Sequence, residues 1–150
     1  MTSRSRLLLL LCLALAGLTF PARAEKLPDT ITTIVVDAVH SDATDIKSVA
    51  GTDMLQDKEA KKFVSLWNSL KFHPGDNHCP HHPGYRLCFY QDKSKVYGYI
   101  AICFECHAVF RLDSENPDHF QDELLFDEGP AAKELHAMLS RMFPGHDAKN

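Results

Sequence analysis

The segment Cys103-Phe-Glu-Cys106-His107 contains the residue types best suited to chemistry in this chain. The spacing C-x-x-C-H is typical of the covalent attachment of a c-type haem. It also fits two ligands of a metal site, a thiol redox pair, or two structural cysteines. The rest of the sequence has to decide between these four interpretations, because it determines the compartment and the geometry of the segment.

The first 24 residues have the composition of a secretory signal peptide. Arginines precede an apolar run from Leu7 to Leu18, and Ala22-Arg23-Ala24 supplies an A-x-A cleavage site. The apolar run is shorter than the about 20 residues that a membrane-spanning helix needs. We therefore expect a signal peptide at residues 1–24, cleavage after Ala24, and one exported domain at residues 25–150, either periplasmic or secreted.

Cleavage makes the protein more acidic. Removing 24 of the 150 residues leaves 126, and because three arginines and no acidic residue are lost, the net charge changes from −4 to −7. An acidic surface repels nucleic-acid backbones and anionic lipids, so we expect neither nucleic-acid binding nor stable membrane insertion. Four cysteines remain, and an even number in an oxidising compartment indicates disulfides. They are Cys79, Cys88, Cys103 and Cys106.

The pattern of apolar residues predicts an α+β fold with the element order β-α-β-β-(β)-α. Strands are expected near residues 30–40, 85–90 and 95–104, with residues 124–126 as a short fourth strand. Helical periodicity is present over residues 55–70 and after Pro130, and residues 41–53 read as a polar connection. We expect two amphipathic helices packed on one face of a small, mainly antiparallel sheet.

The expected core combines the apolar faces of both helices with one face of the central strand. Small or apolar residues recur at every second position from Val96 to Leu112, so one strand is expected to run past Cys106, with a bulge or break near Glu105. The predicted core residues are Phe63, Trp67, Ile100, Ile102, Phe104, Leu135 and Leu139.

This strand geometry separates the two cysteines of the motif. In an extended strand Cys103 and Cys106 point to opposite faces about 10 Å apart, whereas a disulfide needs Cα atoms about 4.4–6.8 Å apart. The hydrophobic register places Leu87 opposite Ile100, and its continuation brings Cys79 beside the motif. We therefore expect Cys79 to be joined to Cys106 or to Cys103.

The run "CPHHPGYRLCFYQDKSKVYGYIAICFEC" resembles a group of uncharacterised exported bacterial proteins that have a Cys-x-Pro-type loop and an "ICF-x-C" strand. The resemblance covers most of the mature chain and implies no activity. Cys88 and His107 fall outside the shared pattern, which counts against an essential C-x-x-C-H motif. The matching positions are Cys79, Pro83, Phe89, Tyr90, Cys103, Phe104 and Cys106.

A metal site is the strongest chemical alternative to a disulfide. Residues 71–84 form a predicted surface loop whose polar side chains are His73, Asp76, His78, His81 and His82. Three cysteines and one histidine close a structural zinc tetrahedron, and imidazole also suits copper. The candidate ligands are Cys79, Cys103, Cys106, His78, His81, His82 and His107.

Exclusion favours a role without catalysis. The sequence has no nucleophile elbow, glycine-rich phosphate loop or H-E-x-x-H motif. A thioredoxin-like setting for the C-x-x-C pair is also absent. We therefore expect no cofactor and a disulfide-stabilised binding or inhibitory protein, of the kind that includes immunity proteins, whose partner is another protein. A zinc- or copper-binding protein is the alternative, and a c-type haem protein is less favoured.

Overall fold

The computed structural model of the protein describes residues 26–75, 82–92 and 94–146. Asp76, His78, Cys79 and His81 therefore lie outside the described residues, as does the predicted signal peptide. The elements are β1 (Ile31–Ser41), β2 (Ile46–Gln56), α2 (Asp57–Asn68), β3 (Phe72–Pro74), β4 (Tyr85–Gln91), β5 (Lys95–Cys103), β6 (Ala108–Leu112), β7 (Phe120–Phe126) and α3 (Pro130–Met142).

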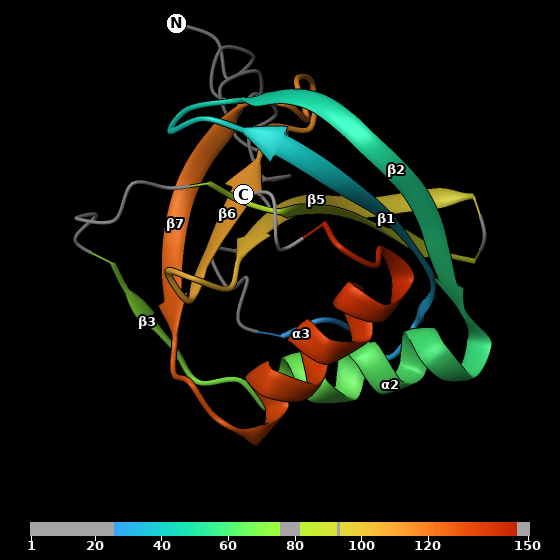
Figure 1. The fold of residues 1–150 in the computed structure, drawn as a ribbon. Helices are drawn as coiled ribbons and strands as arrows, with labels where there is room; N and C mark the ends of the chain where they lie inside the picture. Colours follow the sequence, from blue (N-terminus) through green and yellow to red (C-terminus); the bar gives the residue numbers. More distant parts are fainter. Residues whose placement is uncertain (1–25, 76–81, 93, 147–150) are drawn as a thin grey trace, which may run out of the picture.

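The strands form one antiparallel sheet of seven strands in the order β2-β1-β4-β5-β6-β7-β3. The sheet is strongly curved, and α2 and α3 lie together on one side of it (Figure 1). The predicted α+β class with a mainly antiparallel sheet is confirmed. The sheet has more strands than predicted, because β2, β3 and β6 are additional elements.

Strand β2 occupies residues that were predicted to be a polar connection, and that prediction is wrong. Most of its side chains are exposed, since β2 is the edge strand and pairs only with β1. An edge strand has no neighbour on one side, and most side chains of β2 reach solvent, so its sequence lacks the alternation that marks a half-buried strand. Its backbone pairing with β1, which no local pattern encodes, makes it a strand.

Both helices bury the faces that their apolar spacing predicts. In α2 the buried residues are Ala60, Phe63, Val64 and Trp67. In α3, Pro130 lies in the first turn, where its missing N–H removes no helical hydrogen bond. The buried residues of α3 are Ala132, Leu135, Met138 and Leu139.

Two clusters of buried side chains lie on opposite faces of β5. The larger contains Ile100 and Ile102 together with residues of both helices, such as Trp67 and Leu135. The smaller contains Ala101 and Cys103, which alternate with them along the strand. Of the seven predicted core residues, Phe63, Trp67, Ile100, Ile102, Leu135 and Leu139 are buried, whereas Phe104 is only partly buried.

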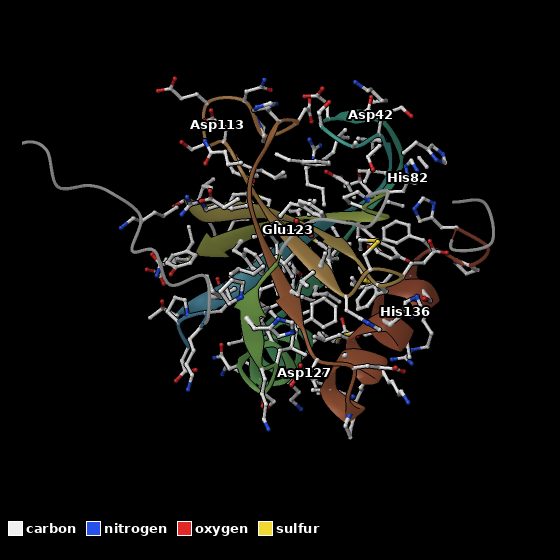
Figure 2. The ribbon with its side chains drawn as sticks, turned by 90° about the vertical axis from the view of Figure 1, so that its left-hand side faces the viewer. Asp42, His82, Asp113, Glu123, Asp127 and His136 are labelled. Carbon is white, nitrogen blue, oxygen red and sulfur yellow. The ribbon has the colours of Figure 1, made fainter. Side chains whose placement is uncertain are left out.

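The smaller cluster is closed at one end by a contact between distant segments. The turn between β1 and β2 meets the connection between β6 and β7 through an isolated bridge between Asp45 and His119. Ile46 donates its N–H to the Asp118 carbonyl at 2.8 Å, and Phe120 donates to Thr44 at 3.1 Å. The labelled residues Asp42 and Asp113 mark this end of the molecule (Figure 2).

Candidate functional site

The C-x-x-C-H segment forms a tight turn. Strand β5 ends at Cys103, residues 104–107 reverse the chain, and Ala108 at the start of β6 pairs with Cys103. The His107 N–H donates to the Phe104 carbonyl at 3.4 Å, and His107 takes a positive φ of 51°. The prediction of one strand running past Cys106 is therefore wrong, and the break near Glu105 is a complete reversal.

The reversal also divides the apolar face that the sequence pattern suggested. Ile100 and Ile102 face the helices, whereas Ala108 and Phe110 belong to the cluster on the other face. The two strands read as one because alternating apolar residues continue through the turn. A change of face is invisible in a pattern that repeats every second residue.

The cysteines of the motif differ in state. Cys106 is disulfide-bonded, while Cys103 and Cys88 are free thiols. The partner of Cys106 is therefore not among the described cysteines. The pairing with Cys79 stays a prediction, because Cys79 lies outside the described residues. The geometric reason we offered for separating Cys103 from Cys106 does not apply, since the two residues sit at a turn and not in a continuous strand.

The Cys103 thiol is buried beside a small cavity of about 130 Å³. Burial raises the pKa of this thiol, although backbone N–H groups of Cys106, His82 and Glu105 act in the opposite direction. A raised pKa leaves the thiol protonated at neutral pH, and a protonated thiol is a poor nucleophile. The cavity is lined by His82, Gly84, Tyr85, Cys103, Phe104, Glu105 and His136.

Two histidines border this cavity from different parts of the chain. His82, which precedes β4, has its Nδ1 at 3.2 Å from the Ser41 carbonyl oxygen. The His136 ring, on α3, stacks on Phe104 with the ring centroids 4.4 Å apart. Both lie on the same side of the molecule (Figure 2). The role of His136 could not be predicted from the sequence, because nothing in its position on α3 indicates that the turn at residues 104–107 packs against it.

Of the other histidines singled out in the sequence, the structure describes His73, from the predicted surface loop, and His107, a ligand candidate. His73, on β3, is 3.4 Å from the Asp127 carboxylate, and the His107 ring contacts Phe126 with centroids 5.6 Å apart. Within the described ranges, no group of three or more His, Cys, Asp or Glu side chains is placed to hold a metal ion. His78, Cys79 and His81 fall outside those ranges.

The helix-free face of the sheet carries a second group of reactive side chains. Cys88 lies opposite Tyr99 on β5 and two residues before Tyr90. Burial raises the pKa of the Cys88 thiol, and the hydrogen bond between Tyr90 and Cys88 raises the pKa of Tyr90 to about 12. These groups therefore stay neutral at physiological pH, and the partly exposed rings of Tyr90 and Tyr99 give this part of the face an aromatic character.

Neighbouring strands extend this surface into what we call the open face, defined by Met54, Val35, Cys88 and Tyr99. Each residue is the cross-strand partner of the next, so the row crosses β2, β1, β4 and β5. The side chains adjacent to Val35 and Cys88 in sequence, such as Ile34 and Leu87, point to the helix side. Met54 is 49% exposed, and Val35 and Tyr99 are partly exposed, whereas Cys88 is buried between its neighbours in the row.

A polar and charged row of Thr52, Asp37 and Arg86 lies beside the row that defines the open face, two residues further along β1. Arg86 donates from Nε to Asp37 at 2.9 Å, and its Nη2 is 2.8 Å from the same carboxylate. Its Nη1 forms an ion pair with Asp118, and Thr52 donates its hydroxyl to Asp37 at 2.6 Å. The Asp37 and Arg86 side chains are only 13% and 18% exposed, so the pair is held rigidly. No local pattern in the sequence marks either residue, since the two are 49 positions apart.

No protein-family model, curated protein or solved structure matches this chain. Among the described residues, no helix is both long and apolar enough to cross a membrane.

Proposed function

We propose that this is an exported, disulfide-stabilised binding or inhibitory protein that acts by docking a protein partner on its open face. The observation that supports the proposal is the row of Met54, Val35, Cys88 and Tyr99 on the helix-free side of the sheet. Tyr, Met and Arg are enriched in protein interfaces, and an exposed apolar surface bordered by polar residues is typical of a docking site. The fixed Asp37–Arg86 pair supplies that polar border.

The chemistry of the face favours binding over catalysis. Both cysteine thiols that the structure describes as free have raised pKa values, so neither is activated as a nucleophile. A tyrosine with a pKa of about 12 is an equally poor base at neutral pH. The neutral, partly exposed phenol groups of Tyr90 and Tyr99 can instead pack against apolar atoms and donate hydrogen bonds to a partner.

The experiment compares two glutamate variants of one strand. Mature protein carrying Met54→Glu, Val49→Glu or neither change is used to capture partners from periplasmic extract, and the captured protein is then purified and titrated by calorimetry. Val49 is the matched control, since it is 47% exposed on β2 and lies outside the row. We expect an equimolar complex with the wild type and with Val49→Glu, and a loss of affinity of at least about tenfold with Met54→Glu.

Two results would contradict this function. The first is an equimolar partner that binds Met54→Glu as tightly as the wild type, which would place the interface elsewhere. The second is a natively exported protein that carries one equivalent of zinc or copper and captures no partner. That outcome would favour the alternative Cys/His metal-binding protein, whose proposed ligands include His78, Cys79 and His81.

A further inference from the structure

Strand β5 has different neighbours along its length. It pairs with β4 from Lys95 to Ile102, but β6 pairs with it only from Ile100 to Cys103. Beyond Arg111 and Leu112 the chain of β6 turns away from β5 toward β7. Among the described strands, none therefore lies along the second side of Lys95–Tyr99, which is about 16 Å of extended backbone.

This free edge forms one wall of a cavity of about 460 Å³ that we call the notch. Half of its lining comes from β5 and half from the end of β6 and the residues that follow. The lining residues are Val96, Tyr97, Gly98, Tyr99, Arg111, Leu112, Ser114 and Gln121. An extended peptide that pairs with such an edge gains affinity from main-chain hydrogen bonds, and an adjacent cavity gives specificity by accepting one of the peptide's side chains.

The other long edge of the sheet is less suited to pairing. Along β2 the register with β1 shifts between Ala38 and Val39, and again between His40 and Ser41. Lys47 and Asp53 are exposed on it. Bulges and charges are the features with which natural proteins protect sheet edges from pairing. The edge of β5 at Val96–Tyr99 also contains a bulge, because its register with β4 shifts between Val96 and Gly98. It differs from β2 in having no charged side chain, and Gly98, within it, has no side chain that could block an incoming backbone.

The charges near the notch select the occupant. Lys95 begins the free edge and Arg111 ends it, where Arg111 forms an ion pair with the exposed Asp122. Asp122 is the acidic group facing Arg111, and its contact uses only one guanidinium nitrogen, Nη2. Among the described residues, no hydrogen bond or ion pair uses the Nη1 group of Arg111. A carboxylate of the partner can therefore bind Nη1 while Asp122 stays bound to Nη2.

We propose that an extended segment of the partner protein adds to the sheet as a strand along Lys95–Tyr99, in line with β6. The segment places an apolar side chain in the notch against Tyr97 and Tyr99, and an acidic side chain reaches Arg111. This inference rests on the proposed binding function and deepens it, since it names the mode of recognition. Tyr99 belongs to both the notch and the open face, so a single partner contacts both surfaces.

The test uses a phage-displayed library of linear dodecapeptides selected against the immobilised mature protein. Affinities of enriched peptides are measured for the wild type, for Ser114→Trp and for Ser48→Trp. Ser114 is an exposed residue at the wall of the notch, and Ser48 is an exposed residue of β2, so both variants make the same change at a surface position. We expect Ser114→Trp to weaken binding at least about tenfold and Ser48→Trp to leave it unchanged.

Hydrogen exchange on the wild-type protein tests the same inference without any substitution, so a loss of folding in a variant cannot affect the result. Amides of residues 95–99 that face the notch should become protected when peptide is added, and proline at alternate positions of the peptide should abolish binding. Selection of no peptide, binding that Ser114→Trp does not weaken, or protection confined to β2 would each overturn strand addition. A natural partner that binds the open face without protecting residues 95–99 would overturn this inference alone, whereas absence of any protein partner would overturn the proposed function.

Discussion

The most direct test of the fold is the replacement of Trp67 by alanine. The side chain is 1% exposed, and its ring lies 5.3 Å from that of Phe72, 6.1 Å from that of Phe63 and 6.3 Å from that of Phe89, measured between centroids. Truncating a buried tryptophan to alanine costs about 3–5 kcal/mol. Because these contacts join α2 to both β3 and β4, we expect a loss of about 4 kcal/mol, a large part of the about 5–15 kcal/mol that stabilises a domain.

The same site permits a finer test, because the indole Nε1–H is buried and donates to no acceptor among the described residues. An unpartnered buried N–H costs about 1–3 kcal/mol. Trp67→Phe removes this group and keeps most ring contacts, so we expect it to destabilise the protein by less than about 2 kcal/mol.

Stability should be measured by urea unfolding followed by far-ultraviolet circular dichroism, since the variants lack the only tryptophan. Lys61→Ala is the matched control, because Lys61 is exposed on the same helix and the change should stay within about 0.5 kcal/mol. A Trp67→Ala protein within about 1 kcal/mol of the wild type would refute the placement of this residue in the core. Equal losses of stability in Trp67→Ala and Trp67→Phe would show that packing of the aromatic ring does not account for the stabilising effect of Trp67.

Three further predictions follow from the site. Cys88 and Cys103 should react with iodoacetamide only after unfolding, because both thiols are buried and have raised pKa values. Cys106 should require reduction as well, because it is disulfide-bonded. Rapid labelling of the native protein would contradict this prediction. Arg86→Ala should lower the free energy of unfolding in urea by about 2–3 kcal/mol, because it leaves the nearly buried Asp37 carboxylate without its charged donor. Adding Asp37→Asn to Arg86→Ala should restore part of this stability, and a double variant no more stable than Arg86→Ala would contradict the explanation. Hydrogen bonds to Lys47 and to the Thr44 amide lower the pKa of Asp42, so its stabilising effect is present above the unfolded pKa of about 3.9 and is lost as the pH falls. Amide protection of Thr44 and Asp45, whose N–H groups both donate to Asp42 at 2.9 Å, should therefore decline below about pH 4, and pH-independent protection would exclude this carboxylate as the cause.

Helices and the central hairpin were predictable because their determinants are local. Ala60, Phe63, Val64 and Trp67 are buried on one face of α2 because side chains three and four residues apart share a helical face. The pairing of Leu87 with Ile100 follows from the alternation of both strands, since a one-residue shift would expose every apolar side chain. The register survives even though the turn and the bulge at Phe89 and Tyr90 differ from a two-residue hairpin.

The edge strands and the turn at residues 104–107 depend on partners far away in the chain. Strand β2 is made a strand by its pairing with β1, and β3 by its pairing with β7, although neither carries a strong apolar pattern. The turn at His107 needs a positive φ, which the residue type does not announce because glycine or asparagine usually occupies such a position. Local periodicity therefore joined β5 and β6 into one strand.

For the candidate sites, the sequence alone determined which groups are available, namely the C-x-x-C-H cysteines, the histidine-rich loop and the acidic charge. Only the tertiary structure decided which of these groups meet. The open face brings together Val35, Met54, Cys88 and Tyr99 from four strands, and Arg86 reaches Asp37 across 49 residues of sequence. Such juxtapositions are set by strand order and register, which result from burying the whole core at once and not from any short segment.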